Sequence, residues 1–374
     1  MTDLLRGIVG MADWRVWAMF GVGLALIWLA VKKEYEPNLL LPMGFGCLLA
    51  NIPFSSAVGG GFLDILFKGG ITNELFPILI FIGVGAMIDF GPLLQDPEML
   101  FFGAAAQFGI FFTMMLALLV GRIPGVTGIP GLREAAAIGI IGAADGPTAI
   151  YVATRFAPAL LAPITVAAYS YMSLVPIIQP PIIRALTTRE ERMIHMENPE
   201  HEVSRTVKVI FPIAVTLIAG IIAPMSVALI GSLMFGNLLR ESGVTERLSK
   251  TAQNELSSLV TILLGITIGS SMGGKQFLNP TTLLIIALGL IAFVFDTAGG
   301  VLFAKLINLF RKRKINPMIG ACGISAFPMS ARVIQKMAQQ EDGSNFIIMH
   351  AVGANVAGQI ASIIAGGLIL ALVR

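Results

Sequence analysis

Charged residues are scarce in this 374-residue chain. Lys, Arg, Asp and Glu together account for 13% of it, whereas the hydrophobic types account for 56%, and the mean hydropathy is +0.84. A soluble domain carries roughly 25% charged residues because its surface faces water. The deficit argues against a soluble enzyme or a nucleic-acid-binding protein, and we expect nearly all of the chain to lie in a lipid bilayer.

Cysteine and histidine, which often ligate metal ions, are also rare. The two cysteines, Cys47 and Cys322, lie in apolar sequence, so we expect buried small hydrophobic side chains and no disulfide. The three histidines, His195, His201 and His350, show no metal-ligand spacing. No removable signal peptide is evident, because the first apolar run is only the first of many.

Long apolar runs fill most of the chain. A helix needs roughly 20 apolar residues to cross the hydrocarbon layer. Runs close to this length occur at residues 16–31, 37–52, 74–94, 99–121, 160–183, 207–223, 225–239, 255–272, 281–306 and 346–373. We therefore predict an all-α polytopic membrane protein with about ten transmembrane helices.

Two short islands of similar sequence interrupt the apolar runs. Residues 141–147 (IGAADGP) and 319–325 (IGACGIS) occupy corresponding places in two halves of the chain, and each is a broken or re-entrant segment rich in helix-breaking residues. Paired interruptions of this kind are the best sequence pointer to an ion or substrate site in a transporter built from repeats. Residues 45–49 also resemble residues 235–239, in the same order. The chain is therefore interpreted as two repeats.

The repeat interpretation divides the chain into an N-terminal membrane repeat (1–186), a cytoplasmic linker (187–206) and a C-terminal membrane repeat (207–374). Basic residues of short loops stay in the cytoplasm, which assigns the loops at 184–208, 240–250 and 311–314 to that side. If the islands re-enter the membrane, the repeats are inverted; if the islands cross it, the repeats are parallel. We favour re-entry, because it also leaves the Lys32-Lys33 loop in the cytoplasm.

The first island contains a carboxylate at membrane depth, Asp145. A charge there is costly and normally faces a cavity or a partner, so a functional role is the default hypothesis. The helix break at Gly146 and Pro147 frees backbone carbonyls, and Thr148 adds a hydroxyl. A carboxylate, a hydroxyl and free carbonyls suit a hard cation such as sodium. The alternative is a helix-capping aspartate near the interface.

The second island offers ligands without charge. Asn316-Pro317 can open a half-helix, Gly320 permits close backbone approach, and Ser325 supplies a neutral oxygen. One charged and one neutral island would together be close to neutral with a monovalent cation bound. We therefore expect the islands to meet near the bilayer midplane, with the side chains of Asp145 and Ser325 less than roughly 10 Å apart. Small-residue packing between helices is the alternative for the second island.

Three further polar residues lie in or beside apolar sequence. Tyr171 begins the next run, and Arg332 follows the second island; an interfacial belt and snorkelling are their respective alternatives. We expect both within one shell of the point where the islands meet. Asp296 is as deeply embedded in apolar sequence as Asp145, and its role is open.

These motifs resemble the integral-membrane beta subunit of the sodium-pumping, biotin-dependent decarboxylases that act on oxaloacetate, methylmalonyl-CoA or glutaconyl-CoA. The resemblance covers almost the whole chain and is strongest at residues 142–148, 169–172, 316–325 and 327–332. It implies that Asp145 is the essential aspartate and that Tyr171 and Arg332 act with it. It also implies roles for the triplet Asn316, Gly320 and Ser325.

The resemblance further implies the function of a primary pump in a bacterial inner membrane. A biotin carrier subunit would deliver carboxybiotin, and this subunit would release the carbon dioxide, consume a proton and export sodium. A carboxyltransferase subunit, a small membrane subunit and further copies of this chain are the other implied partners. Lys336-Met337 does not match a biotin acceptor, so the biotin belongs to another chain. The runner-up is a sodium-coupled carboxylate carrier or cation/proton antiporter, and the motif match decides against it.

Overall fold

The computed structural model describes residues 7, 9–34, 36–123, 131–197 and 203–373, and every element within them is a helix. The prediction of an all-α protein is thereby confirmed. The first half contains α2 (Trp14–Lys33), α3 (Pro37–Asn51), α4 (Phe62–Leu66), η1 (Phe67–Thr72), α5 (Leu75–Met87), α6 (Gly91–Gln95), α7 (Met99–Ala106), α8 (Phe108–Gly121), α9 (Leu132–Gly139), η2 (Ile140–Ala143), α10 (Gly146–Phe156), η3 (Pro158–Leu160) and α11 (Leu161–Leu186). After α12 (Arg189–Arg192), the second half contains α13 (Arg205–Ile222), η4 (Pro224–Ser226), α14 (Val227–Glu241), α15 (Glu246–Thr251), η5 (Ala252–Leu256), α16 (Ser257–Ser270), α17 (Gly274–Phe277), α18 (Pro280–Phe310), η6 (Pro317–Gly323), α19 (Met329–Glu341) and α20 (Ile348–Leu372).

Fewer helices than ten are long and apolar enough to cross a membrane. In the described residues there are five such spans, which are α2, α7 with α8, α13, α18 and α20, and up to seven if two bent pairs each count as one. The pairs bend by 63° at residues 73–74 and by 66° at residue 173. The runs at 37–52, 225–239 and 255–272 form helices of only 15, 15 and 14 residues. These helices are shorter than the roughly 20 residues that a straight crossing requires.

One group of helices joins the two halves of the chain. It consists of α2, α3 and α5 from the first half and α13, α14 and α16 from the second. Here α3 packs on α16, and α14 packs on α5. The contacts are so close that a Cβ atom on Gly46 would collide with the Ile266 carbonyl, and one on Gly236 with the Ile82 carbonyl. Gly46 and Gly236 belong to the similar segments 45–49 and 235–239, so the two segments make equivalent contacts. We call this set the α3–α16 group.

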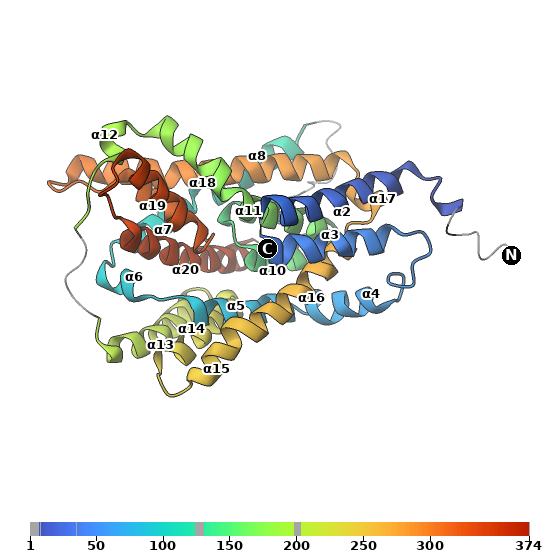
Figure 1. The fold of residues 1–374 in the computed structure, drawn as a ribbon, viewed down its shortest axis with the longest axis horizontal. Helices are drawn as coiled ribbons and strands as arrows, with labels where there is room; N and C mark the ends of the chain where they lie inside the picture. The colour runs from blue at the N-terminus through green and yellow to red at the C-terminus, as the bar shows by residue number, and fades with distance from the viewer. Residues whose placement is uncertain (1–6, 8, 35, 124–130, 198–202, 374) are drawn as a thin grey trace.

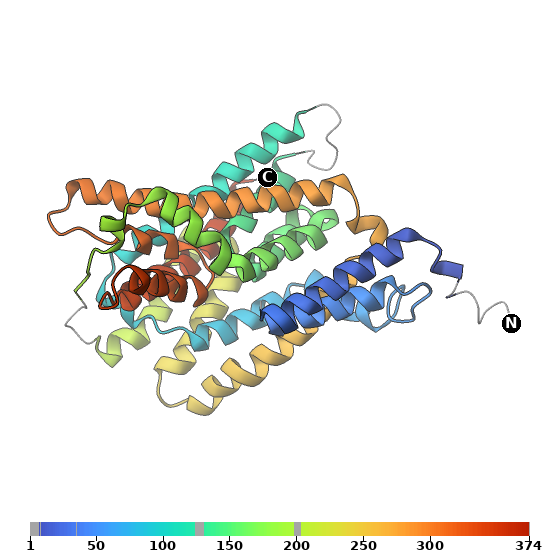
Figure 2. The ribbon, with the colours of Figure 1, turned by 45° about the horizontal axis from the view of Figure 1, so that its top comes forward.

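The second group surrounds the long helix α18. Helix α18 contacts α7, α8, α11, η2 and η6, and α20 packs on α7, η6 and α10. In Figures 1 and 2, α18 (orange) and α15 with α16 (yellow to gold) lie on opposite sides of the molecule, and in Figure 1 α20 (dark red) lies between them. We call α7 to α11 with α18, η6, α19 and α20 the α18 group. Both islands belong to it, since η2 and η6 both pack on α18.

The predicted cytoplasmic linker is anchored to α19 rather than free in solvent. Arg192 Nε lies 2.7 Å from Glu341 Oε1, and their side chains are only 12% and 17% exposed. His195 Nε2 lies 2.8 Å from Asp342 Oδ2. Hydrogen bonds from the hydroxyl and the amide of Ser344, together with His195, lower the pKa of Asp342 to about 2. Residues 198–202 of this linker are outside the described part of the chain.

Candidate functional site

The two islands meet in the interior of the protein. The first consists of η2, the left-handed residue Ala144 (φ 51°) and Asp145, which is the N-cap of α10. Pro147 lies in the first turn of α10, where its missing N–H costs nothing. In the second island, η6 ends at Gly323 and leads to Ser325. The backbone N–H of Ser325 donates to the carbonyl of Ala143 at 3.1 Å, so the expected meeting of the islands is present in the structure.

Asp145 is 4% exposed, and its carboxylate is bound by neutral donors. The Thr148 hydroxyl donates to Oδ2 at 2.7 Å, and the Thr148 amide donates to Oδ1 at 3.3 Å. The Ser362 hydroxyl of α20 lies 3.1 Å from Oδ2. The capping interpretation is thus correct for Oδ1, whereas Oδ2 faces hydroxyl groups from two separate elements. No basic side chain among the described residues forms an ion pair with this carboxylate.

Ser325 is linked to Asp145 through Ser362. The Ser325 hydroxyl lies 2.5 Å from Ser362 Oγ and 3.0 Å from the Gly358 carbonyl. The Gln359 side chain donates to the carbonyl of Ser325. Only one hydroxyl group therefore separates Asp145 from Ser325, well within the expected limit. The sequence alone does not indicate Ser362 and Gln359, because single polar residues in the apolar run 346–373 carry no motif.

A cavity of about 190 Å³ opens beside this cluster, between the two groups of helices. The islands and α20 contribute Asp145, Ser325 and Gln359 to its wall, and α11 contributes Tyr169. The α3–α16 group contributes the opposite wall, which consists of Glu36, Leu39, Ile80, Phe81, Val84, Ser257 and Thr261. The cavity walls and the adjoining hydroxyls of Thr148 and Ser362 are rich in oxygen donors, as a hard cation requires.

The structure places Tyr171 away from this cavity. Its hydroxyl donates to the backbone carbonyl of Ile286 in α18, and its ring packs against Gly289 of the same helix. Tyr169, two residues earlier, faces the cavity instead, and its ring lies against Gly146. Residues two apart point to different sides of a helix, so only one of these tyrosines can face the carboxylate.

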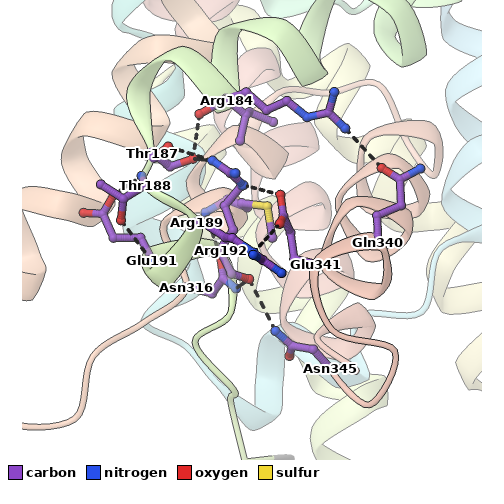
Figure 3. A network of polar contacts seen from close by, with 12 residues as sticks. Arg184, Thr187, Thr188, Arg189, Glu191, Arg192, Asn316, Gln340, Glu341 and Asn345 are labelled. Atoms are coloured by element: carbon purple, nitrogen blue, oxygen red, sulfur yellow. Dashed lines mark hydrogen bonds and ion pairs between the residues drawn. The ribbon is translucent and has the colours of Figure 1, made fainter.

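Asn316 lies at the linker and not at the cavity (Figure 3). Its side-chain carbonyl caps η6 by accepting from the Met318 amide at 3.1 Å. Its amide group donates to the carbonyls of Arg192 and Ile194 at 2.8 and 3.0 Å. Asn345 reaches the same two carbonyls. The expectation that Asn316 shares a site with Asp145 is therefore not met, because protein groups occupy both ends of its side chain.

Gly320 and Arg332 also lie outside the cavity wall. A Cβ atom on Gly320 would collide with the Gly300 carbonyl of α18, and one on Gly300 with the Gly320 carbonyl. Gly320 therefore serves close packing, which was the alternative interpretation. Arg332 is exposed on α19 and has no ion-pair partner among the described residues. The expected shell around the islands thus lacks Gly320 and Arg332.

Asp296 is fully buried on α18 but does not line the cavity. Its carboxylate lies against Gly109, in the first turn of α8, and Gly142 of the first island. The two cysteines, Cys47 and Cys322, are buried and free, as expected. Among the described residues, no cluster of three or more His, Cys, Asp or Glu side chains could hold a metal ion.

Comparisons with known proteins give one family. The family model described as the Na⁺-transporting oxaloacetate decarboxylase beta subunit matches residues 15–373. The methylmalonyl-CoA decarboxylase subunit beta of Veillonella parvula is 51% identical over 354 residues, covering 95% of this chain and 92% of the relative. The glutaconyl-CoA decarboxylase subunit beta of Acidaminococcus fermentans is 50% identical over 360 residues, covering 96% and 94%. The oxaloacetate decarboxylase beta chain of Klebsiella pneumoniae is 46% identical over 408 residues, covering 94% of each. With this similarity over nearly its whole length, the chain belongs to the family of beta subunits of the sodium-transporting decarboxylases and is a multi-pass membrane protein of that family.

Proposed function

We propose that this chain is the membrane subunit of a primary sodium pump, which decarboxylates carboxybiotin and couples that reaction to sodium export and proton consumption. The observation that carries the proposal is the buried Asp145 carboxylate, which lies at a cavity between two groups of helices and is bound only by neutral donors. A buried carboxylate without a basic partner is stabilised by a bound cation. Membership of the sodium-transporting decarboxylases supports sodium as that cation.

Sodium is the substrate that this cluster of oxygens suits. Asp145, Thr148 and Ser325 are proposed as ligands, with Ser362 as a bridging hydroxyl that the sequence did not indicate. A single carboxylate with neutral oxygens leaves the occupied site close to neutral, which keeps the cost of burying the ion low. Because Asp145 belongs to the α18 group and the facing wall to the α3–α16 group, a relative movement of the two groups would open the ion to either side.

Three other residues that the resemblance indicates, Asn316, Gly320 and Tyr171, are assigned positioning roles. Asn316 and Gly320 hold η6 in place, Asn316 through the linker carbonyls and Gly320 through its contact with Gly300. Tyr171 attaches α11 to α18 through its bond to Ile286. Mutation of Asn316 or Gly320 would displace the second island, and mutation of Tyr171 would loosen α11 from α18, in each case without removing a sodium ligand.

The carboxyl group that is released as carbon dioxide is delivered to this subunit by a partner chain. When bound, carboxybiotin supplies a carboxyl group whose release as carbon dioxide provides the driving energy. Arg332 is an exposed cation beside the second island, and we assign it to binding the incoming carboxylate. A biotin carrier subunit, a carboxyltransferase subunit and a small membrane subunit are the proposed partners, and the complex is proposed to contain several copies of this chain.

The topology proposed with this function is two inverted repeats, 1–186 and 207–374, with about ten crossings and re-entrant islands. The reciprocal contacts of Gly46 and Gly236 support a two-fold relation between the halves. Helices of 14 and 15 residues are compatible with crossings where the protein interior, rather than lipid, surrounds their ends.

The test is reconstitution of the purified complex in proteoliposomes. Decarboxylation of the correct acid should drive sodium transport without any other ion gradient, and a biotinylated polypeptide should co-purify with this chain. The secondary-carrier alternative predicts instead that this chain alone exchanges sodium in liposomes and that no decarboxylation accompanies transport.

A further inference from the structure

A second carboxylate, Glu36, faces the same cavity as Asp145. Glu36 precedes α3, whereas Asp145 belongs to the first island, so the two acids lie on opposite walls and on different groups of helices. Tyr169 lies within electrostatic reach of both carboxylates. Neither the family motifs nor the apolar pattern indicates Glu36, because it belongs to a short turn that reads as an ordinary loop.

The carboxylate of Glu36 is free to face the cavity. Glu36 occupies the N-cap position of α3, but its side chain makes no capping bond. It is partly buried, and no hydrogen bond or ion pair joins its carboxylate to another described residue. In contrast, Thr148 and Ser362 hold Asp145 in place. A partly exposed, unpaired acid at a cavity wall raises the local concentration of cations.

The cavity wall also indicates the side from which the cation arrives. Glu36 lies three residues after Lys33, where α2 ends with Lys32 and Lys33. Ser257, on the same wall, begins α16 shortly after the basic loop 240–250. Positively charged short loops remain in the cytoplasm. Glu36 and Ser257 therefore both lie near the expected cytoplasmic ends of their helices. The cytoplasm is the side from which a pump must take up sodium for export.

We propose that Glu36 is the sodium-recruiting residue of this site, a carboxylate at the cytoplasmic entrance that receives the ion and passes it to Asp145. This inference rests on the proposed sodium pump. Because the two carboxylates belong to different groups of helices, a movement of the groups would change their separation. Glu36 then acts during uptake of the ion and not in the occluded state, so it controls sodium affinity rather than the maximal rate.

The experiment compares the purified complex carrying Glu36→Gln with one carrying Glu34→Gln. Glu34 lies in the same turn and is exposed, but it does not line the cavity. We expect Glu36→Gln to raise the sodium concentration for half-maximal decarboxylation about threefold to tenfold, the effect of one charge acting across roughly 10 Å in a partly hydrated site. Turnover at saturating sodium should remain within about twofold of wild type, and Glu34→Gln should change neither quantity.

Two further measurements separate charge from structure. Glu36→Asp keeps the charge and should lie within about twofold of wild type; a loss as large as that of Glu36→Gln would overturn the inference. Raising ionic strength with choline chloride should weaken sodium activation of wild type more than that of Glu36→Gln, because screening acts on the charge. Equal behaviour of the Glu36→Gln and Glu34→Gln complexes, or a fall in turnover alone, would also overturn it. If the wild-type complex itself needed no sodium, the proposed function would fail instead.

Discussion

Replacement of Ser362 by alanine tests the hydroxyl that joins the two islands. Ser362 Oγ lies 3.1 Å from Asp145 Oδ2 and 2.5 Å from Ser325 Oγ. A hydrogen bond to a charged group contributes about 1.5–3 kcal/mol, and sodium binding requires the charged form of Asp145. Partial relaxation of the site leaves an expected loss of about 1.4 kcal/mol, which corresponds to a roughly tenfold higher sodium requirement.

The same substitution should leave the fold intact. After Ser362→Ala, Asp145 retains both of its bonds from Thr148, and the Ser325 hydroxyl retains the Gly358 carbonyl at 3.0 Å. No buried polar group loses its last partner, so the free energy of unfolding should change by less than about 1 kcal/mol.

The assay is sodium-dependent decarboxylation by the purified complex, with thermal unfolding of the same sample as the stability readout. Ser232→Ala is the matched control, because its exposed hydroxyl bonds only to the Ala228 carbonyl of its own helix. A Ser362→Ala complex with wild-type sodium dependence would refute the assignment of this hydroxyl to the site. So would an equal effect of Ser232→Ala.

Three further predictions concern packing and ion pairs. Gly300→Ala and Gly320→Ala should each destabilise the protein by about 2 kcal/mol or more in thermal unfolding, since either Cβ would collide with the carbonyl of the other glycine. If the two folded variants have the same sodium dependence as each other, packing is the role of both glycines. Asp342→Asn should lower the unfolding temperature at neutral pH and by much less at pH 2. The Asp342 carboxyl, whose folded pKa is lowered to about 2, contributes stability above its ordinary pKa near 4 and loses it as the pH falls through about 2. Glu74 and Arg155 form a 2.7 Å ion pair, and their side chains are 14% and 35% exposed. Glu74→Arg or Arg155→Glu alone should lower the free energy of unfolding by about 1 kcal/mol, and the double reversal should recover most of that loss in thermal unfolding.

Each of these predictions has a result that contradicts it. Gly21 lies in α2 with open space around it, so Gly21→Ala should be neutral or stabilising, and destabilisation as large as that of Gly320→Ala would contradict the packing argument. An Asp342→Asn difference as large at pH 2 as at neutral pH would contradict the linkage argument. A double reversal no more stable than either single reversal of Glu74 and Arg155 would show that their partnership contributes nothing.

The charged part of the site could be predicted from the sequence because its cost is local. Asp145 followed by Gly146 and Pro147 is an acid beside a helix break in apolar sequence, and few structural roles offset that combination. Ser325 followed from the similarity of the second island to the first. The structure brings the two together, as a two-fold relation between the islands requires.

The contacts of the motif residues could not be predicted in the same way. A motif shows which residues matter but not what they touch: the amide of Asn316 bonds to Arg192 and Ile194, more than 100 positions earlier in the chain. The resemblance indicates Tyr171, whereas the structure places Tyr169 at the cavity, because a motif does not specify the face of α11 on which a residue lies. That face depends on tertiary packing against α18.

Ser362, Gln359 and Glu36 were missed for a different reason. Ser362 and Gln359 are isolated polar residues in an apolar run, whereas Glu36 lies in the charged stretch at residues 32–36. Their positions at or beside the cavity depend on how α20 and α3 pack. The number of crossings likewise depends on tertiary structure, because apolar runs such as 225–239 form helices shorter than the roughly 20 residues needed to span the membrane. The hydropathy pattern locates the apolar runs, but the residues at which helices begin and end within these runs depend on tertiary contacts.

The most direct test of the account is sodium transport by the reconstituted complex carrying Asp145→Asn. The asparagine keeps the size of the side chain and removes its charge, so the complex should assemble, but neither sodium-stimulated decarboxylation nor uptake of radioactive sodium into the proteoliposomes should occur. Asp89→Asn, which changes an aspartate with a 44% exposed side chain outside the cavity, should retain both activities. Wild-type sodium stimulation and transport by the Asp145→Asn complex would contradict the central claim that this carboxylate binds the transported ion.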